Sequence, residues 1–451
     1  MFVTMVTTFS TTFMGSSLNL SIPAIGDEFD VSAGFLGWVI TAYMLTVAAF
    51  SVPFGRLADI VGRKKIFMPG VAIFSVSSLL CAFSWNIWFM IGLRVIQGLS
   101  GSMIYSTNIP FLINAFEPGR RGRVLGFNSF ATYLGLSLGP AIGGLLNYYA
   151  GWRSIFIVTF AIGITAFIVA INSLPADPKR RSEQISSADA ADVPGNLLYI
   201  VTIGMTIFGL TMMADIDEAV YIASIGVVAF ALFVFRELHT DHPLIKISLF
   251  TKDRGFAFSN LSALLNYGAT FATGYLISIY LQVVMGYSSQ TAGVIMISQP
   301  LVMAVVSPMA GRLSDKFSPY KLSSFGMGLC AAGLMFFVFI HQDYPIWMII
   351  TGLLVTGLGF GFFTTPNTNA IMALVEKKDY GVASSILTTM RSVGHASSMA
   401  LVTIIVQLYM GDSALSEADP AVLVETLRTT FTICIYVCVC GVFFSLARGK
   451  R

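Results

Sequence analysis

Three titratable side chains stand inside long apolar segments of this chain, where ionisable groups are rare and costly. Arg94 interrupts the string LRVIQG (93–98), and Arg391 and His395 lie four residues apart in RSVGH (391–395), so they share one helix face. Such residues typically face a ligand, a partner or a proton path. The alternatives are that the arginines reach an interface with their charged ends and that His395 is a neutral core residue.

Among the asparagines of the apolar segments, four are our candidates for uncharged polar groups of a site: Asn19, Asn108, Asn367 and Asn369. Two of them belong to PNTN (366–369), where a proline interrupts the helical hydrogen bonding. Their amides could bind a ligand or bridge two helices. We predict a substrate cavity lined by Asn19, Arg94, Asn108, Asn367, Asn369, Arg391 and His395 among aromatic side chains and methionines. An apolar cavity with a few polar groups suits amphipathic small molecules.

The most specific pattern is GRLADIVGRKK (55–65), a short connection between two apolar segments. Gly55 and Gly62 permit a tight loop between closely packed helix ends. The Asp59 carboxylate can accept hydrogen bonds from helix N-terminal amides and pair with an arginine, for which Arg63 is our candidate. We interpret these four residues as a conformational lock. A simple basic loop would explain the lysines and arginines, but not the spacing of the glycines and the aspartate.

The same pattern recurs later in the chain. PFGRLAD (53–59) is echoed by PMAGRLSD (308–315), so that Gly55 and Gly311 lie 256 residues apart. We therefore add Gly311 and Asp315 to the predicted lock. A repeat at this distance indicates two similar halves around a central site.

A third pattern, GLSLGPAIGG (135–144), combines a glycine stripe with a proline. Gly135, Gly139 and Gly143 recur every four residues and make a flat face for close helix contact. Pro140 removes a backbone donor and can kink the helix. Generic helix packing would explain the three glycines, but not their combination with Pro140 and Gly144.

The elements that position these residues must be membrane-spanning helices. Of the 451 residues 55% are hydrophobic and 11% charged, which is too apolar for a soluble protein of this length, and the net charge of +3 gives no reason to expect nucleic acid. Fourteen runs are long enough to span a bilayer. They are 3–25, 36–54, 66–83, 89–115, 124–148, 155–174, 195–213, 219–235, 256–285, 291–310, 322–340, 346–373, 382–409 and 426–446.

The basic residues predict the orientation. With the N-terminus in the cytoplasm, 22 of the 26 lysines and arginines fall in cytoplasmic loops or the C-terminal tail, and only Arg153 and Arg428 fall outside. Both termini are then cytoplasmic, no carboxylate lies near the middle of the bilayer, and the first run is an uncleaved helix. We expect a multi-pass protein of a prokaryotic cell membrane.

The expected fold is all-α, with fourteen transmembrane helices in two six-helix bundles and two helices inserted between them. The predicted parts are an N-terminal bundle (1–174), a cytoplasmic linker (175–194), the inserted helices (195–236), a cytoplasmic connector (237–255), a C-terminal bundle (256–446) and a basic tail (447–451).

These strings resemble signatures of the major facilitator superfamily, and the resemblance covers essentially the whole chain. GRLADIVGRKK resembles its loop 2–3 signature, LRVIQG its helix 4 motif, and GLSLGPAIGG the helix 5 signature of its antiporters. GWRSIF (151–156) and PLIKISLF (243–250) are similar to the fourteen-helix branch of the drug:proton antiporters. The resemblance implies proton transfer for Arg94, export as the direction of transport, and a hinge formed by Gly135, Gly139, Pro140, Gly143 and Gly144.

The chain departs from that branch in helix 1, which often carries an aspartate ahead of an asparagine and a proline. Asn19 and Pro23 are present, but the aligned stretch FMGSS (13–17) has no carboxylate. A buried acid is the obvious partner of a lipophilic cation, so cationic substrates are less expected. The candidates for carrying a coupling proton are Asp59, Arg94, Glu117 and His395.

We expect a secondary transporter and not an enzyme, because no nucleophile–base pair stands out. Its predicted partners are a small-molecule substrate, protons and the lipid bilayer, without nucleic acid, a metal, a cofactor or an obligate protein partner. Proton-linked export of small amphipathic molecules is the first interpretation. An importer, symporter or facilitator for a polar or anionic solute is the alternative, and a polytopic membrane enzyme or receptor ranks lower.

Overall fold

The structure is a computed structural model, and it describes residues 1–19, 21–29, 38–174, 192–212, 218–240, 243–245, 247–251, 253–410 and 420–448. Within these ranges all regular structure is helical, and twelve helices are long and apolar enough to cross a bilayer. The chain is therefore an all-α membrane protein.

The N-terminal half of the chain contains seven α-helices in the described ranges. They are α1 (Phe2–Asn19), α2 (Ile22–Phe29), α4 (Trp38–Val61), α5 (Arg63–Ala82), α6 (Ile87–Ala115), α7 (Arg121–Ala150) and α8 (Arg153–Ser173), with a short 3-10 turn η1 (Pro118–Arg120) before α7. We call α1–α8 the N-terminal half.

A helical hairpin and a second group of helices follow. The hairpin is α9 (Val193–Thr211) and α10 (Ala219–His239). After the short α11 (Ser248–Thr251) come α12 (Arg254–Thr270), α13 (Thr273–Ile279), the π-helical η2 (Tyr280–Val284), α14 (Ser289–Met296), α15 (Ser298–Lys316), α16 (Pro319–Val338), α17 (Ile346–Ala373), the 3-10 turn η3 (Lys377–Asp379), α18 (Tyr380–Met410) and α19 (Pro420–Leu446). We call α12–α19 the C-terminal half.

The first and ninth predicted spans are each divided among shorter helices, which is why length and composition support twelve spans and not fourteen. Run 3–25 is shared by α1 and α2, and α1 is rich in threonine and serine, whose hydroxyls bond to carbonyls one turn back. Run 256–285 is broken after α12. There the amide of Ala272 donates to the Ser398 hydroxyl of α18 at 3.1 Å, so a side chain of another helix accepts this amide at the break.

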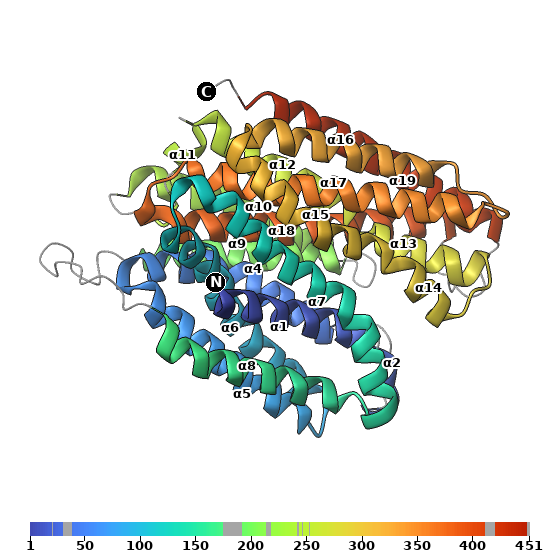
Figure 1. Ribbon diagram of the computed structural model, residues 1–451, viewed down its shortest axis with the longest axis horizontal. Coiled ribbons are helices and arrows are strands. Elements are labelled where there is room, and N and C mark those ends of the chain that lie inside the picture. The colour runs from blue at the N-terminus through green and yellow to red at the C-terminus, as the bar shows by residue number, and fades with distance from the viewer. Residues whose placement is uncertain are drawn as a thin grey trace, which may run out of the picture.

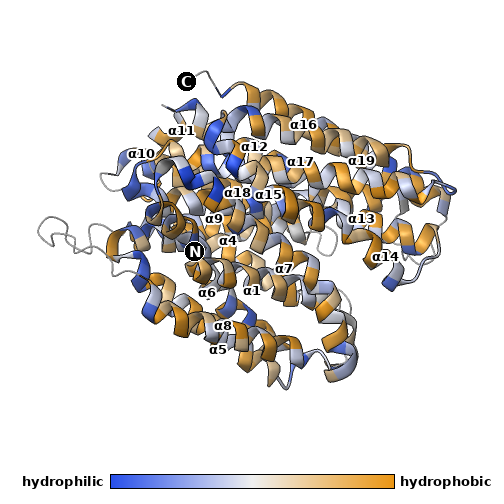
Figure 2. Ribbon diagram, viewed as in Figure 1, coloured by the Kyte–Doolittle hydropathy of each residue, from blue (hydrophilic) through white to orange (hydrophobic). Residues whose placement is uncertain are grey.

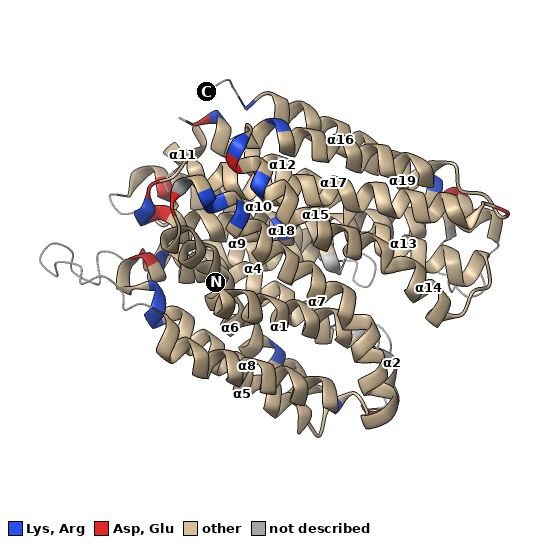
Figure 3. Cartoon of the chain, viewed as in Figure 1, with Lys and Arg blue, Asp and Glu red and all other residues tan. Residues whose placement is uncertain are grey.

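The two halves meet at one end of the helices and diverge toward the other (Figure 1). The contacts between them join α7 to α15 and α17, and join α18 to α4 and α6. The hairpin contacts both halves, because α9 packs against α4 and α18. Lys and Arg gather at the end where the halves meet (Figure 3), and the helix bodies are mostly hydrophobic (Figure 2). Most lysines and arginines drawn there therefore lie at one end of a largely apolar bundle.

A buried ionic group fixes the base of the α9–α10 hairpin. The Asp192 carboxylate caps α9 by accepting from the amide of Gly195 at 3.1 Å, and it pairs with the Arg236 guanidinium of α10 at 2.7 Å. The neighbouring Glu237 is 4% exposed and accepts from the amide of Ile245 at 2.8 Å. These two acids therefore hold the two helices and the following connector together.

At the opposite end of the N-terminal half, Glu28 links α2 to α8. Its carboxylate accepts from the Trp152 indole at 2.8 Å and from the Arg153 guanidinium at 2.6 Å. Arg153 also donates to the carbonyl of Ser84 at 3.2 Å, so one cluster ties three chain segments. The hydrogen bond from Arg153 lowers the pKa of Glu28.

This cluster predicts a pH-dependent contribution to stability. A lowered carboxyl pKa stabilises the fold above the ordinary glutamate value of about 4.3 and ceases to do so as the pH falls through the lowered value. Arg153→Gln should therefore lower the unfolding temperature at pH 7, and its deficit relative to the parent should shrink below about pH 4. Thermal unfolding of both proteins in detergent across pH 3–8 measures this. A deficit that is constant at all pH values would mean that the charge of Glu28 is irrelevant.

Candidate functional site

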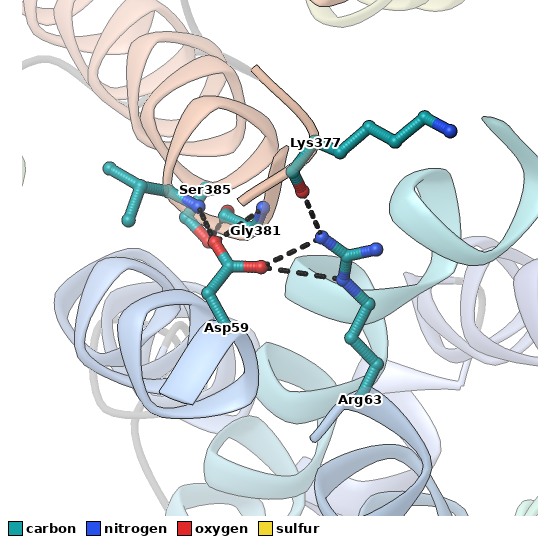
Figure 4. A network of polar contacts seen from close by, with 6 residues as sticks. Asp59, Arg63, Lys377, Gly381 and Ser385 are labelled. Atoms are coloured by element: carbon teal, nitrogen blue, oxygen red, sulfur yellow. Dashed lines mark hydrogen bonds and ion pairs between the residues drawn. The ribbon is translucent and has the colours of Figure 1, made fainter. Parts of the chain in front are cut away.

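The side chain of Asp59, at the end of α4 in the N-terminal half, contacts the first turn of α18 in the C-terminal half. Its Oδ2 accepts from the amide of Gly381 at 2.8 Å and from that of Val382 at 3.2 Å (Figure 4). Its Oδ1 pairs with the Arg63 guanidinium at 2.9 Å, and the same guanidinium donates to the carbonyl of Lys377 at 2.7 Å. Only 2% of the Asp59 side chain is exposed. Both kinds of contact expected from the sequence, helix amides and an arginine, are present.

Glycines make this contact possible. A Cβ at Gly55 would collide with the carbonyl of Gly381 and the hydroxyl of Ser385, so α4 and α18 can approach only without side chains there. Gly62 separates α4 from α5 with a φ of 113°, a left-handed conformation that other residues adopt only with strain. The sequence therefore needs glycine at both positions for different reasons, close approach at one and backbone conformation at the other.

Asp315, at the end of α15, makes the matching contact in the opposite direction. Its Oδ1 accepts from the amide of Gly122 at 2.6 Å and its Oδ2 from that of Arg123 at 2.8 Å, at the start of α7. Gly311 packs against the backbone of Gly122, where a Cβ on either residue would collide. The repeat seen in the sequence is thus a repeat of contacts, because each half caps a helix of the other.

The two caps differ in charge. Arg63 stands four residues after Asp59, whereas Pro319 stands four residues after Asp315. Asp315 has no ion-pair partner within the described ranges and depends on the two amides. Amides at a helix N-terminus favour a negative charge on both carboxylates, and Asp59 has the Arg63 guanidinium as a further partner. Both carboxylates lie at the same end of the molecule, which we call the capped end.

The glycine stripe of α7 packs on α1, in the same half. Cβ atoms at Gly135, Gly139 and Gly143 would each collide with α1. Pro140 lacks the amide that would bond to the carbonyl of Leu136, and the Ser16 hydroxyl of α1 donates to that carbonyl at 3.1 Å. The helix runs unbroken through Pro140, from Arg121 to Ala150. Close helix contact is therefore present here, and a hinge at Pro140 and Gly144 stays a prediction.

Forcing α1 and α7 apart should destabilise the N-terminal half. Gly139→Leu would force a side chain into Ser16, and overpacking of this kind costs about 1–3 kcal/mol. We expect a lower unfolding temperature in detergent and a reduced yield of folded protein. Gly15→Leu is the matched control, because a Cβ on that glycine of α1 meets nothing within 4 Å. Equal unfolding temperatures for the two variants would contradict the stripe as a contact surface.

Arg94 is buried in the N-terminal half and does not reach an interface, so that alternative is wrong. It is 1% exposed, and its Nε donates to the carbonyl of Val39 at 2.7 Å. Its Nη1 donates to the Gln97 side chain at 2.5 Å and contacts the Met14 sulfur at 3.5 Å. Its guanidinium lies 4.6 Å from the centre of the Tyr43 ring. None of the carboxylates in the described ranges pairs with it.

The predicted asparagines serve contacts between helices. Asn108 donates to the hydroxyl of Thr8 on α1. Asn367 donates to the carbonyl of Ser259 on α12 at 3.2 Å, and Asn369 to the hydroxyl of Ser314 on α15 at 3.0 Å. Helix bridging, one of the two alternatives left by the sequence, is therefore what these three amides do here. The side chain of Asn19, the last residue of α1, lies outside the described part.

Arg391 and His395 lie among aromatic rings between the halves. The Arg391 guanidinium lies 5.4 Å from the centre of the Tyr267 ring and donates to the Thr368 hydroxyl at 3.3 Å. The His395 ring is edge-on to Tyr267 at 5.3 Å and stacks on Phe271 at 4.0 Å. Glu117 lies apart from all of these, exposed between α6 and η1.

Several partners were missed by sequence reasoning. Gly122 and Gly381, which present the amides to the caps, went unnoticed, and so did the rings around Arg391. A signal for the glycines exists, because each is the second residue of its helix and follows a short polar turn. The rings carry no comparable signal, since 13% of the chain is aromatic.

Comparison with known proteins assigns the whole chain to one group. The family model described as Major Facilitator Superfamily matches residues 4–399 and 259–450. Among solved structures, the human organic anion transporter MFSD10 (TETRAN) superposes with a TM-score of 0.67 at 12% identity, over 98% of this chain and 96% of that one. At this identity the likeness shows the fold alone.

Curated relatives are similar over most of their length. The riboflavin transporter RibZ of Clostridioides difficile is 32% identical over 392 residues, 87% of this chain and 84% of the relative. The multidrug resistance protein B homolog of Mycobacterium tuberculosis is 31% identical over 386 residues, 84% and 70%. The methylenomycin A resistance protein of Bacillus subtilis is 29% identical over 397 residues, 87% and 84%.

Proposed function

Because the chain belongs to the major facilitator superfamily, whose members are transporters and not enzymes, we propose that it is a proton-linked exporter of small amphipathic molecules. The observation that supports this best is the pair of caps, in which Asp59 of α4 caps α18 and Asp315 of α15 caps α7. Both join the halves at the same end, so making and breaking them together closes and opens that end. Alternating access requires such a reversible closure.

The direction of transport is proposed from the relatives. Two of those described are named as resistance proteins, for multiple drugs and for methylenomycin A, and export is how a transporter confers resistance. The helix 5 string 135–144 supports the same direction. In this scheme the capped end faces the cytoplasm, and the structure corresponds to the outward-facing state.

We propose that Asp59 carries the coupling proton and that Arg94 modulates it. Protonation would turn a charged acceptor into a neutral one and remove the attraction to Arg63, so it would weaken the cap. Glu117 is a weaker candidate, because it is exposed and outside the contact between the halves.

The test is flux in proteoliposomes with an imposed pH gradient. Purified protein is reconstituted with a fluorescent amphipathic substrate, and transport is followed with the gradient in each direction and with none. Proton-linked export predicts that substrate moves against the proton flow and stops accumulating when an ionophore collapses the gradient. Flux that ignores the gradient would rule out proton coupling.

A second candidate is uptake of a polar solute. The riboflavin transporter of Clostridioides difficile is the relative that favours it, together with the absence of a carboxylate from the stretch 13–17. Riboflavin is therefore included in the same assay. Movement of riboflavin in the direction of the proton flow would select this alternative.

We also propose fourteen membrane-spanning segments, with both termini in the cytoplasm of a prokaryotic cell. Segment 3–25 and segment 256–285 are the two added to the twelve. The bundles would be 1–174 and 256–446, and the α9–α10 hairpin, within 195–236, would span the membrane beside their interface.

Accessibility of single cysteines tests this topology. In a variant without the five native cysteines, Glu218→Cys and Asp343→Cys should react with an impermeant maleimide added to intact cells. Lys321→Cys and Lys378→Cys should react only after the membrane is permeabilised. All four positions are exposed in the structure, so exposure alone does not produce the contrast. The reverse pattern would overturn the orientation, and labelling of all four in intact cells would overturn the number of spans.

A further inference from the structure

Arg391 is a positive charge inside the bundle, and the described part of the chain places no counter-charge beside it. It lies about 16 Å along α18 from the start of that helix, at 1.5 Å per residue. Its one side-chain hydrogen bond goes to a neutral group, Thr368, and its Nε is buried without a partner. No carboxylate within the described ranges pairs with it. The guanidinium therefore keeps donor capacity for an acceptor that the described residues do not supply.

Aromatic rings of the C-terminal half surround this charge. The guanidinium faces the Tyr267 ring of α12, and that ring is edge-on to Phe360 of α17 at 5.3 Å and to His395 of α18 at 5.3 Å. His395 in turn stacks on Phe271. Three helices thus present their rings to one another at the level of Arg391.

The N-terminal half completes the group. Tyr133 of α7 is edge-on to Phe360, with ring centres 6.5 Å apart. Arg391 and its rings therefore lie where the two halves face each other. A substrate that is passed from one side of the membrane to the other must be bound at this kind of position.

Chemistry limits what can bind here. A partly buried guanidinium without a carboxylate is costly, and a carboxylate, sulfonate or phosphate on a ligand would offset that cost through the paired donors of the guanidinium. Rings in edge-on arrangement accept a further planar ring at their faces or edges. A cation would meet Arg391 and find no negative group beside it. We infer that the substrate is an organic anion that carries an aromatic ring, and this inference rests on the proposed transport function.

Exposure indicates the side from which such a ligand arrives. Tyr267 and Phe360 are 6% and 8% exposed, whereas Phe271, one turn farther from the capped end, is 37% exposed. The ligand ring would reach Phe271 and His395 first and place its anionic group on Arg391. The caps of Asp59 and Asp315 bar the opposite side.

Equilibrium binding to the purified protein in phosphatidylcholine nanodiscs tests the substrate class without a proton gradient. The probes are naphthalene-2-sulfonate, trimethyl(2-naphthyl)ammonium and cyclohexanesulfonate, measured by calorimetry. We expect naphthalene-2-sulfonate to bind most tightly. Arg391→Gln should weaken its binding at least about tenfold, Arg391→Lys less, and Tyr267→Leu should weaken the naphthalene probe more than the cyclohexane probe.

Arg428→Gln is the matched control, because Arg428 lies at the far end of the C-terminal half and donates to the carbonyl of Ile340. It should bind all three probes as the parent does. Tighter binding of the ammonium probe, or equal binding of naphthalene-2-sulfonate by the parent and a folded Arg391→Gln protein, overturns the inference. Because no gradient is used, these results are independent of whether transport is proton-linked. Anion binding without gradient-dependent flux would refute the proposed coupling and leave the substrate class standing.

Discussion

Asp59→Asn is expected to abolish most transport while the protein still inserts and folds. The asparagine keeps the shape of the side chain, but its neutral oxygen accepts weaker hydrogen bonds from Gly381 and Val382 and no longer attracts Arg63. Charge-assisted bonds contribute about 1.5–3 kcal/mol each, so losing the charge should shift the balance between closed and open capped ends at least about tenfold. A transporter whose capped end stays mostly open completes few transport cycles.

Two measurements separate this effect from misfolding. Transport is assayed in proteoliposomes, and the distance between spin labels on Val61→Cys and Lys378→Cys, at the facing ends of α4 and η3, reports the closure. Asp59→Asn should broaden the distribution of this distance toward longer values. Asp315→Asn should do so less, because that cap has no arginine to lose. A variant with unchanged distances and unchanged transport would remove Asp59 from the conformational change.

The sequence was sufficient to find one side of each cap but not the other. Asp59 and Asp315 stand in a repeated string whose glycine spacing has no simple alternative explanation. It was predictable that these carboxylates accept hydrogen bonds from helix amides, because a buried carboxylate at a helix end needs hydrogen-bond donors. Which helix supplies those amides depends on how the halves dock, and a contact between residues such as Asp59 and Gly381 has no local signature.

The same reasoning explains where prediction from the sequence was coarse. Asn367 and Asn369 are two residues apart on one helix, so their amides face different neighbours, α12 and α15. The span 256–285 was a continuous apolar run, yet it breaks after Thr270 because a hydroxyl on another helix satisfies the freed amide. Hydropathy records the apolar run but not the remote hydroxyl that permits the break.

Arg94→Met is expected to eliminate gradient-driven accumulation without a matching loss of stability. Removing the guanidinium ends its bonds to Val39 and Gln97 and its contact with Tyr43, which together favour the parent by a few kcal/mol. It also removes an uncompensated buried charge, whose desolvation penalty is itself several kcal/mol. The two effects oppose each other, so the unfolding temperature should change by only a few degrees. Methionine roughly preserves the length of the side chain.

The functional loss should be selective, because downhill flux needs the conformational change and accumulation also needs the proton. Arg94→Met should therefore retain part of its downhill flux in proteoliposomes and lose accumulation against a gradient at least about tenfold. Arg94→Lys is the control, since it keeps a positive charge near Val39 and Gln97 but lacks the paired donors, and it should retain part of the accumulation. A large fall in unfolding temperature for Arg94→Met, with downhill flux and accumulation lost together, would instead make Arg94 a structural residue. A parent-like accumulation would exclude Arg94 from coupling, and the Asp59 carboxylate and the His395 imidazole would then be the candidates inside the bundle for carrying the proton.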